Sequence, residues 1–267
     1  MSELIDTVKA GAKCAIPATV RQQFQPRRIH AFCLGIPKSG TTSIAGMFKS
    51  NYRVFHEPKR PKIVAKMYAH YQGELSDEGL CLYYKKRDKQ LWLDMESNCF
   101  LGYRPDLLYR VYPGSHYILT VREPKSWLGS IFDNNINFPR TESPTVRHWH
   151  DVLFEPHKFS YTRHDQVLKE HNLYPLDAYL NYWINANKSV LDAIPENRLL
   201  VLGTREITHK VQLIADFLGV PADTLEVEGS HLHRTRRKHS ITDLIDPDYL
   251  AERLEAECGE LHKRLLA

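Results

Sequence analysis

A short polar loop between two apolar stretches is the part of this sequence best suited to chemistry. Residues 33–48 read CLGIPKSGTTSIAGMF, the pattern of a buried strand, a tight loop and the start of a helix. The loop consists of Pro37, Lys38, Ser39, Gly40, Thr41 and Thr42. In such a unit the backbone N–H groups and the positive end of the helix dipole point to one place. We therefore expect the loop to bind an anion such as a phosphate or a sulfate group.

The loop has the glycine spacing of a nucleotide P-loop without its lysine. In GxxxxGK(S/T) a lysine follows the last glycine, whereas here Thr41 follows Gly40 and Lys38 lies inside the loop. The sequence PKSGTT instead resembles the 5′-phosphosulfate loop of sulfotransferases, enzymes that take a sulfuryl group from 3′-phosphoadenosine 5′-phosphosulfate (PAPS) and release 3′,5′-ADP (PAP). The resemblance implies that residues 37–42 bind this donor substrate. Gly40 would let the backbone approach the phosphosulfate, and the hydroxyl groups would donate hydrogen bonds to it. Lys38 would stabilise the bridging oxygen as it gains charge.

A second segment is similar to the sulfotransferase motif for the 3′-phosphate. The family uses an arginine and a serine eight residues apart after a strand, and HYILTVREPKSWLGSIF places Arg122 and Ser130 at that spacing. The resemblance implies that the planar guanidinium group binds the 3′-phosphate and that Ser130 adds a hydroxyl from the helix beginning near Pro124. Taken alone, an arginine after a strand is an ordinary surface ion-pair residue as often as it is a phosphate-binding residue.

The resemblance extends over most of residues 29–267, with RLLVLGTREIT and KVQLIADFLGVP similar to the late strand and helix of many sulfotransferases. GSHLHRTRRKH resembles the basic loop that closes over the 3′-phosphate and adenine; the alternative is a solvated charge run. Its basic residues are Arg234, Arg236, Arg237 and Lys238. Two features differ from the cytosolic small-molecule branch, because Ser43 replaces its tryptophan and its RKGxxGDWK signature is missing. The chain is closer to bacterial, carbohydrate-type or tyrosine-type relatives.

Sulfuryl transfer to an alcohol needs a base beside the acceptor hydroxyl. Glu57 follows Lys38 by 19 residues, in NYRVFHEPKRP. This position is similar to that of the glutamate base in the carbohydrate and tyrosine branches, whereas the cytosolic branch uses a histidine, for which His56 is the candidate. Because side chains alternate along a strand, we expect only one of these neighbours to face the site, and we choose Glu57. The alternative is that Glu57 caps the helix begun by Pro58.

Two further segments concern the acceptor. WLDMES, residues 92–97, resembles the acidic strand end that lines the acceptor pocket in the carbohydrate branch, which implies that Asp94, Glu96 and Ser97 bind the acceptor. A strand-end aspartate is otherwise a common turn residue. A histidine-rich stretch follows at residues 145–165, with His148, His150, His157 and His164. No carboxylate or cysteine accompanies these histidines at a known ligand spacing, so we expect no metal and instead a lid whose aromatic residues shape the acceptor pocket.

Length and composition bound the class of protein. The 267 residues, 42% hydrophobic and 25% charged with a net charge of +4, indicate one domain over 1–267 with a lid or acceptor insertion at about 133–175. The small net charge does not suggest general nucleic-acid binding. The five cysteines lie far apart, which favours free thiols in the cytoplasm over disulfides or a zinc site. We expect neither a cleaved leader nor a transmembrane segment.

Alternating strand and helix patterns must position these residues. We expect strands at about 29–36, 52–56, 91–94, 116–121 and 198–202. We expect helices at IVAKMYAHY, RPDLLYRVY, PLDAYLNYWINANKSVLDAI and KVQLIADFLGV, and a last helix capped by Asp246 with Pro247 in its first turn. This order predicts an α/β fold with a central parallel sheet flanked by helices. The resemblance specifies it as the P-loop-containing nucleotide hydrolase-like architecture of sulfotransferases.

The sequence therefore predicts a PAPS-dependent sulfotransferase whose acceptor, a small molecule, glycan or lipid with a free hydroxyl, is open. A P-loop kinase or other ATP-dependent protein is the first alternative, since LWLD could pass for a Walker B strand. The displaced lysine and the Arg122/Ser130 pair argue against it. A non-catalytic module that binds an anionic partner is the second alternative.

Overall fold

Five parallel strands form the centre of the protein. The computed structural model describes residues 22, 24–138, 144–228 and 238–266. The strand order is β2-β3-β1-β4-β5, and all four strand pairings are parallel. The strands are β1 (Ala31–Cys33), β2 (Val54–His56), β3 (Met95–Ser97), β4 (His116–Val121) and β5 (Leu199–Gly203). The predicted α/β fold with a central parallel sheet is confirmed.

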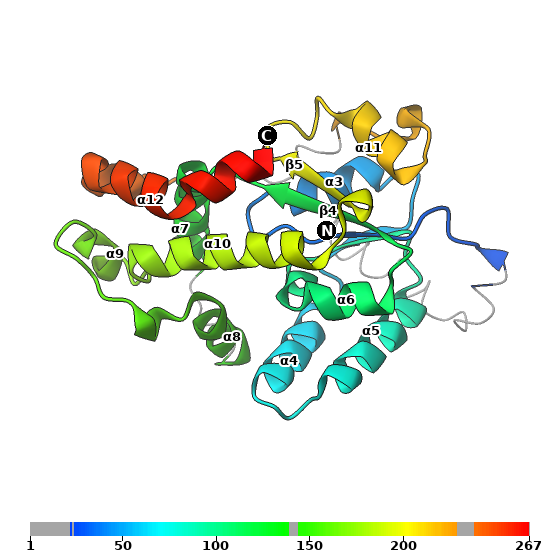
Figure 1. Ribbon diagram of the computed structural model, residues 1–267, viewed down its shortest axis with the longest axis horizontal. Helices are drawn as coiled ribbons and strands as arrows, with labels where there is room; N and C mark the ends of the chain where they lie inside the picture. Colours follow the sequence, from blue (N-terminus) through cyan, green and yellow to red (C-terminus); the bar gives the residue numbers. More distant parts are fainter. Residues whose placement is uncertain (1–21, 23, 139–143, 229–237, 267) are drawn as a thin grey trace.

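Helices cover both faces of this sheet, as Figure 1 shows. They are α3 (Thr41–Phe48), α4 (Arg60–Tyr71), α5 (Asp77–Leu91), α6 (Pro105–Val111), α7 (Pro124–Asn137), α8 (Pro144–Phe154), α9 (Gln166–Glu170), α10 (Leu176–Ala193), α11 (Val211–Leu218) and α12 (Pro247–Leu266). Short 3₁₀ turns are η1 (Cys99–Tyr103), η2 (Pro156–Lys158), η3 (Glu196–Arg198), η4 (Ala222–Thr224) and η6 (Ile241–Leu244).

Side-chain alternation along β1 separates two apolar cores. Ala31 and Cys33 belong to the core under α3 and α11, whereas Phe32 packs on the other face. That second core is the larger, and α4, α6, α7 and α10 contribute to it. The predicted final helix is confirmed, because α12 starts at Pro247 and the Asp246 carboxylate accepts hydrogen bonds from the N–H groups of Asp248 and Tyr249, each at 3.1 Å.

The predicted strand at 91–94 is wrong. Leu91 ends α5, Trp92 adopts a left-handed conformation with φ of 49°, and β3 begins only at Met95. The helix α5 itself was not predicted. Its buried face includes Arg87 beside Leu80, Cys81 and Tyr84, so the apolar pattern that predicts a helix is interrupted by a charge.

The region about 133–175 contains more regular structure than its sequence suggests. The end of α7, all of α8 and the short α9 lie in it. Trp149 and Phe154 of α8 are buried, so this helix is packed into the domain.

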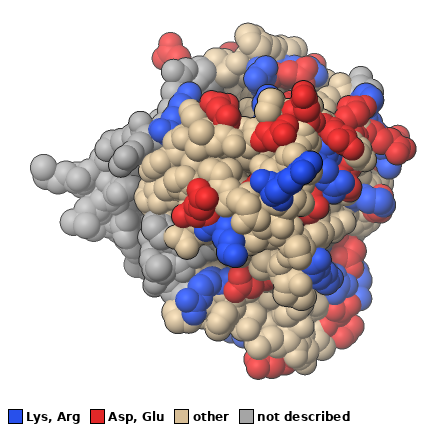
Figure 2. All heavy atoms as spheres, turned by 90° about the vertical axis from the view of Figure 1, so that its left-hand side faces the viewer, with Lys and Arg blue, Asp and Glu red and all other residues tan. Residues whose placement is uncertain are grey.

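On the face in Figure 2, basic and acidic side chains lie among each other, as expected for a net charge of +4. In the parts of the chain that the structure describes, no helix has both the length and the hydrophobicity that crossing a bilayer requires.

Candidate active site

A cleft of about 1500 Å³ lies at the carboxyl ends of the strands. Its walls come from the segments that follow β1, β2, β3, β4 and β5, together with α7, α8, α10 and η6. Ligands of open parallel sheets bind at this edge, because the connecting loops meet there. Among the predicted site residues, the cleft is lined by Pro37, Lys38, Gly40, Thr41, Thr42, His56, Glu57, Arg122 and Ser130.

The loop after β1 bends sharply before α3. Lys38 and Gly40 have positive φ angles of 69° and 110°. At Gly40 a Cβ would also lie 2.8 Å from Ile207 Cδ1, so only glycine fits this position without strain. Gly40 is the residue at the start of α3, which directs the positive end of that helix toward the loop.

Ser39 does not contribute its hydroxyl to the cleft as predicted. Its Oγ donates to the Ile36 carbonyl at 2.7 Å and lies 2.8 Å from Thr120 Oγ1 in the buried interior. The Ser39 carbonyl accepts a hydrogen bond from Thr204 after β5. Ser39 therefore fastens the loop to the sheet, while its neighbours face the cleft.

Both threonines of the loop contact His56. The Nε2 atom of His56 lies 3.1 Å from Thr41 Oγ1 and 3.3 Å from Thr42 Oγ1. The histidine thus connects the end of β2 with the first turn of α3. These hydroxyl groups are at a helix start, where an anionic group is favoured.

Arg122 stands directly beside the loop. Its Nε donates to Ser126 Oγ at 2.9 Å and one guanidinium nitrogen lies 3.4 Å from the Lys38 carbonyl. Ser130 also lies on α7, one turn after Ser126, and both serines line the cleft. The Trp183 indole donates to the Arg122 carbonyl at 3.1 Å, which fixes the backbone there.

The two cations share a partly desolvated site. Burial lowers the pKa of Lys38, and the nearby charge of Arg122 lowers it further, while Asp133 acts in the opposite direction. Burial also lowers the pKa of Arg122, with a contribution from Arg205. Holding two like charges in this place is unfavourable until negative charge binds beside them, so the arrangement suits an anionic ligand that reaches both.

Glu57 reaches the cleft in an unexpected way. The prediction that strand alternation would turn His56 and Glu57 to opposite sides is wrong, because Glu57 follows the last residue of β2 and has a φ of 47°. As a result His56 Nε2 and Glu57 Oε1 lie 4.0 Å apart, and both residues line the cleft. Helix α4 begins only at Arg60, with Lys59 at its N-cap, so capping does not explain Glu57.

The Glu57 carboxylate is held by a thiol. Cys99 Sγ donates to Oε1 at 3.0 Å, and Arg60 Nε lies 3.9 Å from Oε2. Burial and the Glu57 charge raise the pKa of Cys99 well above its ordinary value, so the thiol keeps its proton and remains a donor. Burial, followed by Cys99 and Glu57, likewise raises the pKa of the neighbouring Tyr182.

The three residues predicted to bind the acceptor lie elsewhere. Asp94 precedes β3 at the opposite edge of the sheet, where its carboxylate accepts from the Arg53 side chain at 2.8 Å and from two backbone N–H groups. Glu96 is buried against Arg87, with the closest atoms 2.6 Å apart. Ser97 is also buried and donates to the Thr41 carbonyl at 2.7 Å. None of these three lines the cleft, so this prediction is corrected.

The remaining predicted residues fall in two groups. Arg234, Arg236 and Arg237 lie outside the described residues, whereas Lys238 beside them lines the cleft. The histidines of the predicted lid have separate surroundings: His148 stacks on Tyr68, His150 lies beside Phe154, and His164 is 2.9 Å from the Asp246 carboxylate.

Sequence reasoning missed part of the cleft wall. Missed residues include Arg60, Cys99, Asp133 and Tyr182, whereas Trp149 belongs to the stretch 145–165 whose aromatic residues were expected to shape the acceptor pocket. Cys99 could have been found, because it follows β3 by two residues and a chain segment after a parallel strand belongs to the ligand edge. Asp133 and Tyr182 lie inside helices, where an ordinary polar or aromatic position gives no such signal.

Comparisons with known proteins place the chain in a family. No curated protein sequence is significantly similar to it. Among solved structures, the sulfotransferase from Alicyclobacillus acidocaldarius is 19% identical, with a TM-score of 0.49 over 86% of this chain and 90% of that chain. The sulfotransferase domain from the curacin biosynthetic pathway is 14% identical, with a TM-score of 0.34 over 84% of this chain and 86% of that chain.

A third structure, the sulfotransferase domain from the Synechococcus PCC 7002 olefin synthase, is 14% identical, with a TM-score of 0.37 over 84% of this chain and 83% of that chain. At these values we draw no conclusion about the site from the three structures. The family model described as "Sulfotransferase domain" matches residues 30–226, which is most of the chain. The chain therefore belongs to the sulfotransferase domain family.

Proposed function

We propose that this protein transfers a sulfuryl group from PAPS to a hydroxyl group and releases 3′,5′-ADP. The observation that carries the proposal is the meeting of three elements in one cleft. The loop with Lys38, the Arg122/Ser130 pair and the Glu57 carboxylate come from different segments of the chain and line the same space. The first two suit the two anionic ends of the donor, and the third suits the acceptor.

The loop serves the end of the donor that reacts. The N–H groups at the start of α3 and the hydroxyls of Thr41 and Thr42 donate to the 5′-phosphosulfate oxygens. During transfer the bond between the sulfur and the bridging oxygen breaks, and its electron pair stays on the phosphate. Lys38 stabilises the charge that grows on this leaving oxygen, which lowers the barrier more than it tightens binding.

Arg122 and Ser130 serve the other end of the donor. We assign them the 3′-phosphate, because the guanidinium group can donate to two phosphate oxygens and keeps its charge over the whole physiological range. Ser126 already holds Arg122 Nε at 2.9 Å, so the group is oriented before the donor arrives. Lys238 lines the same cleft, and we assign it to this end of the donor together with the predicted basic residues Arg234, Arg236 and Arg237.

Glu57 serves the acceptor. Its carboxylate accepts the proton of the acceptor hydroxyl while the hydroxyl oxygen forms the new bond to sulfur, and the products are a sulfate ester and 3′,5′-ADP. Since Cys99 holds Oε1, the other carboxylate oxygen is the one we assign to the acceptor. His56 bridges this carboxylate and the loop threonines, so we assign it a positioning role. No step of this scheme uses a metal.

We also propose that the protein works in the cytoplasm. The described cysteines Cys33, Cys81, Cys99 and Cys258 are free thiols, and three of them are buried. Thiols of this kind persist in a reducing compartment. Fractionation of the source cells followed by immunodetection tests this location.

Calorimetric titration with three nucleotides tests the donor assignment. We expect 3′,5′-ADP to bind the wild-type protein more tightly than 5′-AMP, and Arg122→Ala to remove most of this difference. ATP with magnesium should bind weakly. Equal affinity for 5′-AMP and 3′,5′-ADP would contradict the assignment of Arg122, and preferential binding of ATP would favour a kinase.

A further inference from the structure

The tryptophans of this chain differ in what their indole N–H groups contact. Three of them donate to backbone carbonyl groups, Trp92 to Gln25, Trp127 to Pro37 and Trp183 to Arg122, at 2.9, 2.9 and 3.1 Å. Trp149 is the fourth, and it lines the cleft with a side chain only 1% exposed. Within the part of the chain that the structure describes, its Nε1 has no hydrogen-bond partner.

A buried donor of this kind is unfavourable without a partner. An N–H group that is buried and unpaired loses its hydrogen bond to water without replacing it, and native proteins contain few such groups. A ligand that enters the cleft and accepts from Trp149 Nε1 would remove this cost.

Other aromatic rings line the same cleft. The ring centroids of Tyr103 and Trp149 lie 4.8 Å apart in a T-shaped contact, and those of Phe154 and Tyr182 lie 4.5 Å apart. Phe100 completes the set, which we call the aromatic wall: Phe100, Tyr103, Trp149, Phe154 and Tyr182. Such a wall favours the flat or apolar body of a ligand.

The wall begins next to the proposed base. The turn η1 carries Cys99 at its first position and Tyr103 at its last. Cys99 holds the Glu57 carboxylate, and Tyr103 packs against Trp149, so one short segment connects the base with the wall. A ligand whose hydroxyl meets Glu57 would extend along these rings.

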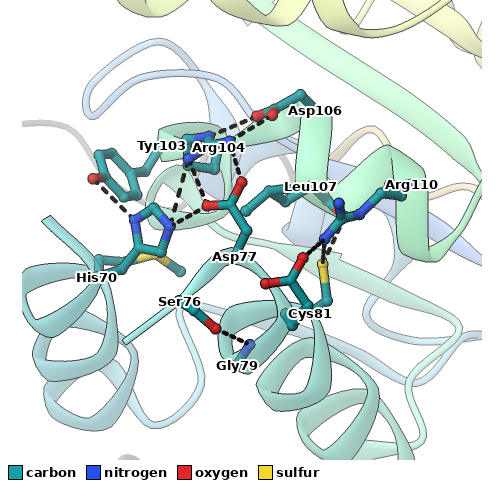
Figure 3. Close-up of polar contacts among 12 residues, drawn as sticks. His70, Ser76, Asp77, Gly79, Cys81, Tyr103, Arg104, Asp106, Leu107 and Arg110 are labelled. Atoms are coloured by element: carbon teal, nitrogen blue, oxygen red, sulfur yellow. Dashed lines mark hydrogen bonds and ion pairs between the residues drawn. The ribbon is translucent and has the colours of Figure 1, made fainter. Parts of the chain in front are cut away.

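Polar contacts hold the Tyr103 side chain in place. His70 Nδ1 lies 3.3 Å from the Tyr103 hydroxyl, and His70 Nε2 lies 2.8 Å from the Asp77 carboxylate. Figure 3 shows how this histidine joins Tyr103 to Asp77, and how Arg104 reaches both Asp77 and Asp106. Because α4, α5, η1 and α6 are tied together here, the Tyr103 end of the wall is positioned before any acceptor binds.

The charges along this part of the cleft are matched. Glu57 has Arg60 at 3.9 Å, and Glu155 has Lys158 at 2.6 Å. Arg60 in turn lies over the Phe100 ring, 5.6 Å from its centroid. The surroundings therefore favour a neutral acceptor over a charged one.

We propose that the acceptor is a neutral phenol or alcohol with an apolar ring body and a second oxygen, which accepts from Trp149 Nε1. Its reacting hydroxyl lies at Glu57, and its body packs on the aromatic wall. This inference rests on the proposed sulfuryl transfer and adds the class of acceptor to it. Trp149 is then a residue that determines specificity.

Three probes test the class of acceptor in the presence of PAPS. The first, called the coumarin probe, is 7-hydroxycoumarin, a two-ring phenol with a carbonyl oxygen opposite the hydroxyl. The second is 2-naphthol, of similar size without that oxygen, and the third is N-acetylglucosamine. We expect the wild-type protein to sulfate both phenols, to reach half-maximal rate at a lower concentration of the coumarin probe, and to use the sugar poorly. Preference for the sugar, or no binding of either phenol to the complex with 3′,5′-ADP, would overturn the proposal.

A variant then tests the indole donor. Trp149→Phe should weaken the apparent affinity for the coumarin probe by about 2- to 10-fold, the value of one hydrogen bond, with little change for 2-naphthol. Trp92→Phe is the matched control, because its indole bonds to a backbone carbonyl away from the cleft. An equal change for both phenols would contradict the role of Nε1. If Trp149→Phe does not fold, the affinities of the wild-type protein for the coumarin probe and for 2-naphthol are compared instead. Equal affinities would contradict the role of Nε1.

Binding of 3′,5′-ADP separates this inference from the proposed function. If 3′,5′-ADP binds and only the sugar is sulfated, the sulfuryl transfer stands and the class of acceptor is wrong. If 3′,5′-ADP fails to bind, the proposed function itself fails.

Discussion

Two glutamates at neighbouring strands have different surroundings: Glu96 is buried within β3, whereas Glu57 is partly exposed just after β2. Glu96 in the middle of β3 is enclosed by Arg87, with one contact at 2.6 Å and two at 3.1 Å, and by Asn98 at 2.7 Å. Glu57, just past the end of β2, accepts from one thiol at 3.0 Å and has its nearest guanidinium nitrogen at 3.9 Å. Glu96 lies away from the cleft, and Glu57 lines it.

The difference shows how a fold separates structural from chemical carboxylates. Burial opposes the charge of Arg87, but Glu96 and Tyr83 outweigh burial and raise the pKa of Arg87, so this guanidinium group keeps its charge beside Glu96. A carboxylate with all its hydrogen-bonding positions occupied cannot also serve as a base for a substrate. Glu57 keeps a free side toward the cleft, and this leads to predictions that separate the two residues.

The largest effect is expected for Glu57→Gln. This variant keeps the shape of the side chain and removes its basicity, so the rate constant of transfer should fall by about 10²–10⁴. The affinity for 3′,5′-ADP should persist, because the donor contacts lie on Lys38, Arg122 and Ser130. Single-turnover rates and calorimetry on the same preparation measure both quantities.

His56→Asn is the matched variant for this experiment. It should change the rate much less, since His56 contacts the threonine hydroxyls and is assigned no proton transfer. An inactive His56→Asn beside an active Glu57→Gln would make the histidine the base and reverse our assignment.

Lys38→Ala should cause a loss of order 100-fold or more in the rate constant, because a preorganised cation meets charge that grows during transfer. Circular dichroism should show a folded protein. Lys125→Ala provides a control, since that lysine lies at the start of α7 and does not line the cleft. A rate within a few-fold of the wild type would remove Lys38 from the mechanism.

Glu96→Gln should affect stability and leave chemistry intact. Breaking a buried ion pair by neutralising one partner costs about 3–5 kcal/mol of unfolding free energy, because Arg87 keeps an unpaired charge in the interior. Urea titration measures this loss. The double variant Arg87→Met/Glu96→Leu should recover much of it. A stable Glu96→Gln with a greatly reduced rate constant would instead give Glu96 a part in the reaction.

The pH dependence of 3′,5′-ADP binding reports on Lys38. Its pKa is lowered from 10.5 by burial and by Arg122, so the free protein loses this charge at a lower pH than an ordinary lysine does. An anion restores the charge, so binding takes up a proton, and affinity should fall as the pH rises through the lowered pKa. Calorimetry in buffers of different ionisation enthalpy detects this proton uptake. Lys38→Arg should keep its affinity at high pH; an identical decline in that variant would assign the titration to another group.

The smallest effect is expected for Cys99→Ala. Removing the thiol takes away one hydrogen bond to Glu57, worth about 0.5–1.5 kcal/mol, so the rate constant should fall by about 2- to 10-fold. The acidic limb of the pH–rate profile should move as well, which a purely structural cavity would not cause. Cys99→Ser should restore most of the rate. A Cys99→Ala variant with an unchanged profile would limit Cys99 to packing.

The sequence predicted the cleft residues of the loop and of α7 better than the rest of the cleft wall, for a physical reason. Lys38, Gly40 and Thr41 lie next to each other in one strand–loop–helix unit, so local geometry alone brings them together. Arg122 and Ser130 are joined in the same way by β4 and α7. The aromatic wall combines residues of η1, α8 and α10. Such an assembly depends on tertiary packing, which a periodic sequence pattern does not contain.

The errors around β3 have the same origin. Leu91, Trp92 and Leu93 are apolar and suggest a strand, but they end α5 and turn the chain toward β3. Shifting the strand moves Asp94 from its expected carboxyl end to its amino end, on the far side of the sheet from Lys38. For Glu57, the positive φ one residue beyond β2 brings its side chain to the same cleft as His56, against the expected alternation.

One measurement addresses the central claim most directly. The wild-type protein and Lys38→Ala are each incubated with a panel of hydroxyl acceptors and PAPS that carries a radiolabelled sulfuryl group, and a parallel series receives ATP labelled in its γ-phosphate. We predict that the wild-type protein moves labelled sulfur to an acceptor, with release of 3′,5′-ADP. The rate for Lys38→Ala should be lower by about 100-fold or more. Transfer of labelled phosphate from ATP without transfer of labelled sulfur would contradict the account.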